Sequence, residues 1–252
     1  MTDTAKDAVK RQFGAAAASY VTSSVHARGS DLPLLPGLAG LTGTEEVLDV
    51  ATAAGHTAFA LAPHARRVVG VDLTPEMLVE ARRQASAKGF ANISFEEADA
   101  EHLPFPDAAF DVVTCRIAAH HFSDVAAFCR EAARVLRPGG RLLVVDNMVP
   151  EDEELDAFIN TVEKLRDPSH GRALRLSEWE RYVAGAALAY ELAHQFTTPM
   201  DREDWLARMN PSAAVAADVR RRLAGAAPRV KEAFGITETG FHLSKAIVVG
   251  RK

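Results

Sequence analysis

Short apolar runs alternate with helical patterns between residues 45 and 150 of the chain. The runs are rich in β-branched residues, as in buried strands, whereas the segments between them repeat apolar residues at helical spacing. This alternation predicts βαβ units and a parallel sheet. The five strands predicted here cover residues 46–50, 67–72, 92–96, 110–115 and 141–146.

Segments on both sides of these strands complete the predicted organisation. Residues 1–42 are predicted to form an N-terminal helical cap, and residues 43–150 a ligand-binding core. Residues 151–235 are predicted to form a helical cover with one strand near 190–198, and residues 236–252 the last strand. The predicted fold is a single α/β domain, Rossmann-like and doubly wound. Its mostly parallel, seven-stranded sheet has an antiparallel last strand and a helical cover.

The composition excludes some classes of protein without deciding the chemistry. Hydrophobic residues make up 48% of the 252 positions and charged residues 25%, as in ordinary soluble globular proteins. The net charge of −5 argues against a nucleic-acid partner. Cys115 and Cys129 form no CxxC pair, which predicts a reduced, cytoplasmic setting. We expect no membrane span, because no apolar stretch is long enough, and the sequence leaves a homodimer open.

Carboxylates stand at three successive predicted strand ends, where sheets of this kind bind ligands. Asp49 lies near the end of the first strand and is followed by a turn of small residues that ends at Gly55. Asp72 ends the second strand, where a carboxylate can accept hydrogen bonds from both hydroxyls of a ribose. Asp99, after the third strand, can accept one from an exocyclic adenine amine. Together they predict a site for an adenosine with an amino-acid tail.

A family resemblance extends over residues 47–146. This region resembles the class I S-adenosylmethionine-dependent methyltransferases, in particular the small-molecule branch that includes the ubiquinone/menaquinone-biosynthesis C-methyltransferases. The matching segments occur in the family's order. They are Val47-Leu48-Asp49-Val50 with Gly55, Gly70-Val71-Asp72, Ala98 to Phe105, Phe110-Asp111-Val112-Val113, and Val135 to Gly140.

The resemblance implies S-adenosylmethionine as the cofactor and a role for each matching residue. Asp49 and the backbone of Ala51 would hold the methionine amino group, and Asp72 the ribose diol. Asp99 and Ala100 would read the adenine edge. The other cofactor-binding residues implied are Tyr20, which would close over the cofactor, Ala53, Gly55, Leu73, Met77, which would pack on adenine, Arg116 and His121.

The turn after the first strand departs from the family pattern. The family usually has glycine where this chain has Ala51 and Ala53. Alanine pays a steric cost at positive φ, so binding would weaken if either position required such an angle. We expect both alanines to adopt ordinary backbone angles, which would make the change nearly silent.

Histidines are the candidate catalytic side chains, as bases or as groups that position the acceptor. His120 and His121 are adjacent, so at most one is expected to face the pocket, and a packed structural role is an equal alternative. His170 lies in a polar stretch that is either a lid or a surface loop. The sequence has no HExxH or comparable spacing, and we expect no metal.

The predicted reaction is an in-line displacement that moves the cofactor's methyl group to a small organic acceptor and releases S-adenosylhomocysteine. One alternative is a non-catalytic protein that binds S-adenosylmethionine. A second is a nicotinamide-dependent oxidoreductase, which is less favoured because residues 51–55 lack the GxGxxG spacing. The identity of the acceptor, and whether carbon, oxygen, nitrogen or sulfur is methylated, stays open.

Overall fold

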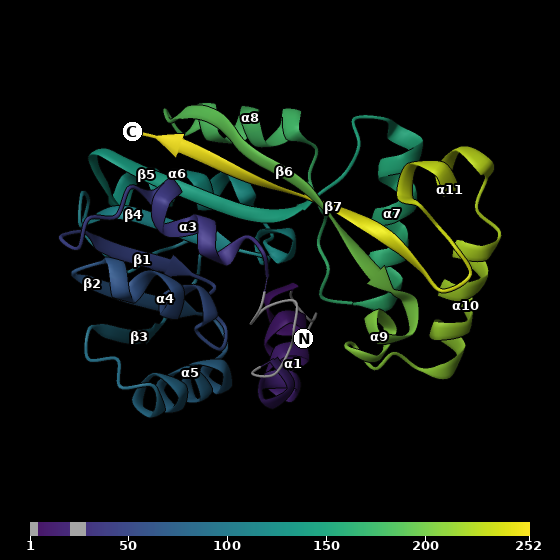
Figure 1. The fold of residues 1–252 in the computed structure, drawn as a ribbon, viewed down its shortest axis with the longest axis horizontal. Coiled ribbons are helices and arrows are strands. Elements are labelled where there is room, and N and C mark those ends of the chain that lie inside the picture. The colour runs from purple at the N-terminus through teal and green to yellow at the C-terminus, as the bar shows by residue number, and fades with distance from the viewer. Residues whose placement is uncertain (1–4, 21–28) are drawn as a thin grey trace.

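The computed structural model describes residues 5–20 and 29–252 of the chain. Within these residues seven strands form one sheet in the order β3-β2-β1-β4-β5-β7-β6 (Figure 1). The strands are β1 (Glu46–Val50), β2 (Arg67–Asp72), β3 (Ile93–Glu97), β4 (Phe110–Arg116), β5 (Leu136–Met148), β6 (Ala189–Asp201) and β7 (Gly240–Arg251).

The pairing of the strands confirms the predicted doubly wound topology. β1 pairs in parallel with both β2 and β4, so the chain crosses to the other side of β1 after β3. β2 with β3 and β4 with β5 are also parallel, while β7 lies antiparallel between β5 and β6. The strand order therefore reverses between β1 and β4, the place where sheets of this kind bind ligands.

The fifth strand is longer than predicted at its start. Arg137 to Gly140 had the composition of a turn, but Leu136 already pairs with Phe110, and the ladder shifts register before Val112. Gly139 supplies a φ of 82° within this irregular part, and its N–H donates to Lys252 O. Glycine and proline bend the strand here without ending it.

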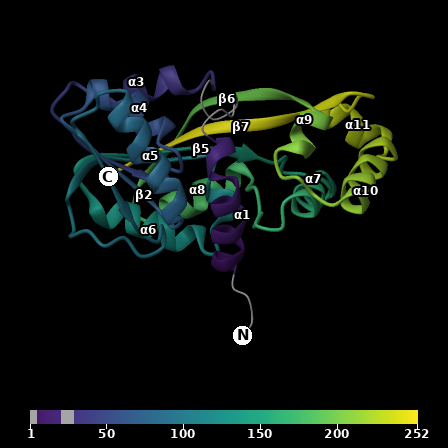
Figure 2. The same cartoon turned by 90° about the horizontal axis from the view of Figure 1, so that it is seen from below.

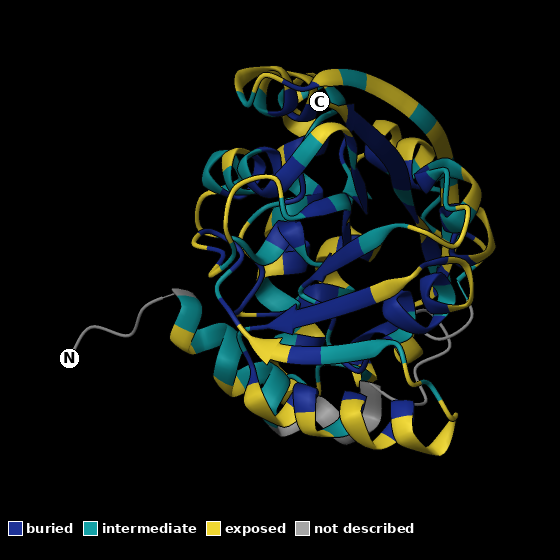
Figure 3. Cartoon of the chain, turned by 90° about the vertical axis from the view of Figure 1, so that its left-hand side faces the viewer, coloured by how far each residue is buried: buried dark blue, intermediate teal, exposed yellow. Residues whose placement is uncertain are grey.

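Helices cover both faces of the sheet (Figure 2). They are α1 (Ala5–Tyr20), α3 (Leu35–Ala39), α4 (His56–Leu61), α5 (Pro75–Ala87), α6 (Val125–Val135), α7 (Glu153–Arg166), α8 (Leu176–Gly185), α9 (Arg202–Ala207), α10 (Ala213–Ala224) and α11 (Pro228–Phe234), with 3-10 turns η1 (Leu32–Leu34), η2 (Ala62–His64) and η3 (Ala119–His121). α3, α4 and α5 share one apolar core with the sheet, and α6 and α8 share another. The central strands are buried between these layers (Figure 3), which explains their nearly continuous apolar sequence.

The range 151–235, expected as one helical cover, is divided between two places. α8 packs with α6 against the sheet, whereas α7, α9, α10 and α11 gather around the far ends of β6 and β7 (Figure 1). These four helices and strand ends have their own apolar core, in which Trp205 meets Phe241 edge to face with ring centroids 4.9 Å apart. We call this part of the chain the side lobe.

Candidate cofactor and acceptor site

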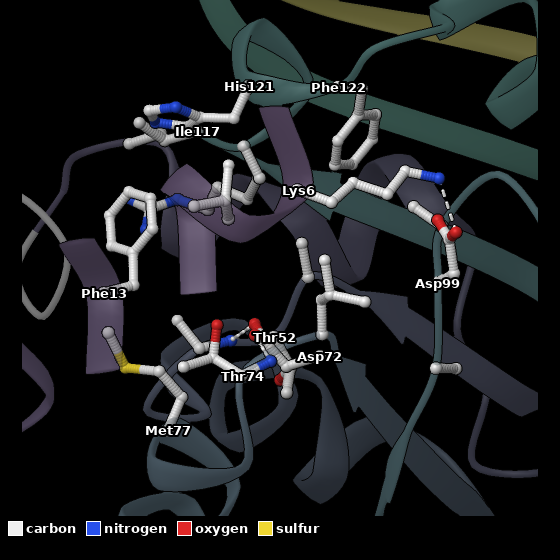
Figure 4. A pocket seen from close by; sticks show the side chains of 18 of the residues that line it. Lys6, Phe13, Thr52, Asp72, Thr74, Met77, Asp99, Ile117, His121 and Phe122 are labelled. Carbon is white, nitrogen blue, oxygen red and sulfur yellow. Dashed lines mark hydrogen bonds and ion pairs between the residues drawn. The ribbon is translucent and has the colours of Figure 1, made fainter. Parts of the chain in front are cut away.

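A cavity among the described residues opens at the carboxyl ends of β1, β2 and β4 and at the loop after β3 (Figure 4). It holds about 990 Å³ of space, its open mouth included, which is within the range of small-ligand sites. Helix α1 covers it with Lys6, Val9 and Phe13. The predicted site residues that line the cavity are Ala51, Ala53, Asp72, Leu73, Met77, Asp99, Ala100, Arg116 and His121.

The remaining predicted residues are not in this lining. They are Asp49, Gly55, His120 and His170. The side chain of Tyr20 lies outside the described part of the chain. The structure therefore brings predicted residues from four strand ends together around one cavity. Other predicted residues do not line it.

The turn after β1 contradicts our expectation for its alanines. Ala51 has a φ of 54° and Ala53 a φ of 46°, so both adopt the left-handed region. The chain must reverse sharply here, because Thr52 N bonds back to Val71 O at 2.9 Å and Gly55 N to Thr52 O at 2.8 Å. The prediction was wrong because it assumed that alanine in place of glycine meant ordinary backbone angles. The turn instead keeps positive φ at both positions, the geometry that normally favours glycine.

Gly55 is required by packing as well as by its backbone angle. Its φ is 88°, and a Cβ atom at this position would lie 2.7 Å from the ring of Phe59. The same residue precedes α4, and its carbonyl accepts from Phe59 N at 2.8 Å. The glycine shapes the turn without touching the cavity.

Asp49 acts through its neighbours. The side chain is almost completely buried, and its two oxygens accept hydrogen bonds from the hydroxyls of Thr52 at 2.6 Å and Thr114 at 2.7 Å. Burial raises the pKa of Asp49 to about 6, against the effect of these bonds. Since Thr52 lines the cavity, the carboxylate holds one wall of the site.

Asp72 is fixed in place by the backbone around it. Its Oδ2 accepts from Ala53 N and its Oδ1 from Thr74 N, each at 2.9 Å. Burial raises the pKa of this carboxyl, while the two N–H donors favour its charged form. A carboxylate has about four acceptor positions, and Asp72 lines the cavity, so it can also accept from a diol there.

Lys6 closes the cavity at the end where Asp99 lies (Figure 4). Its ammonium lies 2.5 Å from Asp99 Oδ2 and 2.7 Å from Glu101 Oε2. Burial opposes ionisation of Asp99, but Lys6 outweighs it and lowers the pKa of the carboxyl. Sequence reasoning missed Lys6, because it is far from both partners along the chain; only the amphipathic character of α1 hinted at a cover.

Arg116 and Ile117 form the opposite wall, at the end of β4. Arg116 is paired through Nε and Nη2 with the carboxylate of Asp31, and both side chains are buried. Asp31, a second residue that the sequence did not reveal, precedes η1. Ile117 has a φ of 53°, which is a strained angle for a β-branched residue. Strain of this kind concentrates at functional sites.

Three histidines stand next to one another beside the cavity. The ring centroids of His120 and His121 are 4.2 Å apart, and those of His120 and His170 are 5.5 Å apart. His120 is buried with Nδ1 2.5 Å from Asp146 Oδ1; burial disfavours its charged form, but Asp146 outweighs this and raises the pKa of the imidazole. His170 Nε2 bonds to Asn160 Oδ1 at 2.9 Å.

His121 is the histidine that lines the cavity, as the prediction of one pocket-facing member requires. It lies at the far end from Asp99 and packs edge to face on Phe13, with centroids 4.9 Å apart (Figure 4). Its Nδ1 lies 3.0 Å from Ser169 O, an atom that only accepts, so Nδ1 carries the proton and Nε2 a lone pair. Burial and the neighbouring His120 lower the pKa of His121 to about 4, which keeps the ring neutral at pH 7.

The described residues contain neither a candidate membrane span nor a candidate metal cluster. No helix in them is long and apolar enough to cross a membrane. No group of three or more His, Cys, Asp or Glu side chains in them converges as a metal site. Both cysteines are free and buried, and Cys115, on β4, belongs to the apolar core that the sheet shares with α6 and α8.

A doubly wound sheet with acidic strand tips around one cavity defines an α/β protein with a ligand site at its switch point. Comparison with known proteins makes this more specific. Residues 48–144 match the family model described as a methyltransferase domain. The chain is 41% identical over 225 residues to the uncharacterized methyltransferase YcgJ of Bacillus subtilis, covering 89% of each chain.

A solved structure and a second relative agree with this. The crystal structure of YcgJ from B. subtilis superposes with a TM-score of 0.86 at 39% identity, covering 88% of this chain and 97% of that one. The demethylmenaquinone methyltransferase of Deinococcus radiodurans is 48% identical over 102 residues, which cover 40% of this chain and 42% of that protein.

The chain belongs to the class I S-adenosylmethionine-dependent methyltransferases. It is an enzyme of methyl transfer. The non-catalytic binder and the nicotinamide-dependent oxidoreductase are not favoured by any of these matches.

Proposed function

We propose that the cavity under α1 holds S-adenosylmethionine and presents its methyl group to a small organic acceptor. The observation that supports this is the arrangement of Asp72, Asp99 and His121 along a single cavity, with the two carboxylates on neighbouring strand ends and the histidine at the far end. Asp72 would hold the ribose diol, and Asp99 with the backbone at Ala100 the adenine edge. The sulfonium methyl would then lie toward Arg116 and His121.

Two other proposed contacts follow from the positions of the residues. Met77 and Leu73 line the cavity beside Asp72 and would pack on the adenosine. Asp49 would act as a positioning residue, because its carboxylate is bonded to Thr52 rather than exposed to the cavity. When bound, the cofactor supplies an activated methyl group, and the protein supplies alignment and exclusion of water.

His121 is the proposed base or positioning group. Its neutral ring has a lone pair on Nε2 that can accept a hydrogen bond from the acceptor, and its pKa of about 4 makes it a weak base, which favours the positioning role. His120 and His170 are not in the cavity lining. Turnover to S-adenosylhomocysteine on a panel of phenols, enols, amines and thiols would reveal the acceptor. A His121→Asn variant should then lower kcat more than His170→Asn; equal rates would assign His121 a packing role only.

The cofactor assignment is tested by titration calorimetry with S-adenosylmethionine and, as the rival ligand, NAD. Asp72→Ala should weaken S-adenosylmethionine binding by at least tenfold, since it removes the diol acceptor and leaves two backbone N–H groups without a partner. Asp107→Ala, at an exposed loop position, is the matched control and should bind as the wild type does. Unchanged affinity in Asp72→Ala would refute the site. The homodimer and the cytoplasmic setting stay predictions.

A further inference from the structure

A buried lysine lies at the ligand edge of the sheet, outside the machinery described so far. Lys245 is on β7 and is 3% exposed, yet its ammonium has no hydrogen bond or ion pair within the described ranges. Burial lowers the pKa of Lys245 to about 8, although Asp31 counteracts this effect. A buried ammonium is unfavourable unless it is paired, so the fold keeps this charge at a cost.

A second buried polar group without a partner lies directly opposite. Asn147 on β5 is the antiparallel register partner of Lys245, which places the two side chains on the same face of the sheet. The Oδ1 atom of Asn147 is buried and accepts no hydrogen bond in the described part of the chain. Nearly all buried polar atoms in folded proteins are satisfied, so a neighbouring donor and acceptor that both lack partners indicate a place for something else.

The charges around Lys245 favour a negative occupant. Its electrostatic neighbours are the cations Arg116 and Arg208 and the carboxylates of Asp31 and Asp146. Both carboxylates are already engaged, Asp31 by Arg116 and Asp146 by His120 and by backbone N–H groups. Arg116 and Asp31 form one ion pair, which leaves Lys245 and Arg208 beside Asp146, a carboxylate already bonded to His120 and to backbone N–H groups.

Lys245 and Asn147 lie on the side of the sheet where we expect the acceptor rather than the cofactor. The tips of β1, β2 and β3 supply the adenosine and methionine contacts, and β5 and β7 are the next strands beyond β4 along the sheet. Arg116, which lines the cavity, is one neighbour of Lys245. Asp146, another neighbour, bonds to His120, whose ring stacks near His121. Neither Lys245 nor Asn147 is in the cavity lining itself, but Arg116 and the contacts of Asp146 with His120 link them to its methyl-donor end.

We propose that the methyl acceptor is a small organic anion with a hydroxyl beside its charged group, bound with its charge on Lys245 and with the hydroxyl donating to Asn147 Oδ1. This inference rests on the proposed function, because it places the acceptor beyond the cofactor's methyl group. It assigns two residues that no motif reveals, and it narrows the acceptor from any nucleophile to hydroxycarboxylates and chemically similar anions.

The test compares Lys245→Met with wild type and with Lys88→Met, a control at an exposed lysine of the α5 C-terminus. Lys245→Gln serves as a second variant if the methionine packs badly. The probes are 2-hydroxybenzoate and mandelate, which carry a hydroxyl beside the carboxylate, and each is paired with its uncharged amide. Binding is measured by calorimetry and thermal shift with saturating S-adenosylhomocysteine.

We expect the acids to stabilise wild type and the control more than the amides do. Lys245→Met should lose at least tenfold in affinity for the acids and little for the amides, and without probes it should melt at or above the wild-type temperature. The inference is overturned if no acid stabilises the wild type, or if Lys245→Met binds the acids as tightly as the wild type does. It is also overturned if both Lys245 variants melt well below the wild-type temperature. Binding of S-adenosylhomocysteine separates the two proposals. If Lys245→Met still binds it, the proposed cofactor site stands whatever happens to the acids. If the wild type does not bind it at all, the proposed function itself is refuted.

Discussion

Replacement of the two left-handed alanines by glycine should stabilise the protein. Ala51→Gly and Ala53→Gly each remove a Cβ atom from a residue with φ near 50°. A non-glycine residue at such an angle costs on the order of 1–2 kcal/mol. Glycine also gives the unfolded chain more freedom, which costs about 0.4–1 kcal/mol in stability. The balance favours glycine by roughly 0.5–1 kcal/mol at each position.

The matched control is Ala54→Gly in the same turn. Ala54 is fully buried and is not among the residues with positive φ. Its replacement removes a buried methyl group and gives the unfolded chain more freedom, and both effects destabilise the fold. The free energy of unfolding should therefore fall by about 1–2 kcal/mol. The three variants differ by one methyl group each, which makes the sign of the change a direct report on backbone angle.

Urea unfolding monitored by circular dichroism measures these free energies, and a thermal melt should show the midpoint rising by about 2–3 °C for each favourable change. Ala51 and Ala53 are close neighbours, so the double variant need not show the sum. Titration with S-adenosylmethionine checks that each variant keeps its site. If Ala51→Gly and Ala53→Gly lose as much stability as Ala54→Gly, the left-handed strain is not real and the reasoning fails.

Two further predictions concern charge. Asp49→Asn should change the pH dependence of stability: because the pKa of Asp49 is raised from 3.8 to about 6, the folded wild type holds a proton that the unfolded chain releases, and its free energy of unfolding falls as the pH rises through that window. Urea unfolding at several pH values should show that fall reduced in Asp49→Asn, and a constant difference between the two proteins would contradict it. Lys6→Ala removes two partly exposed ion pairs of α1, so S-adenosylmethionine binding should weaken by two- to fivefold, or about 0.5–1 kcal/mol, in low salt. This loss of affinity should vanish in high salt, and Lys10→Ala, the control, should bind as the wild type does. A loss that is the same in low and high salt would show that the ion pairs of Lys6 do not hold α1 over the cavity.

The sheet and the acidic strand ends could be predicted because they depend on local pattern. Apolar runs bounded by Asp49 and Asp72 define strands and their tips, and a parallel sheet brings those tips to one edge. The prediction of Asp99 near the same cavity also needed only the order of the strands.

Contacts between distant segments could not be predicted in this way. Asp31 meets Arg116, and Lys6 meets Asp99, only after helices fold across the sheet edge, and no spacing in the chain encodes either pair. The angles of Ala51 and Ala53 were missed for another reason: the demand for positive φ comes from the hydrogen bonds of the turn, whereas the sequence shows only the residue that has to meet it.

The side lobe has an apolar core distinct from the two cores that flank the sheet. It is nevertheless carried on β6 and β7, whose near halves belong to the sheet. Substitutions inside the lobe can therefore accumulate without loosening the layers that hold Asp49 and Asp72. Such a division makes the lobe a segment that could be exchanged between relatives while the two cores flanking the sheet stay intact.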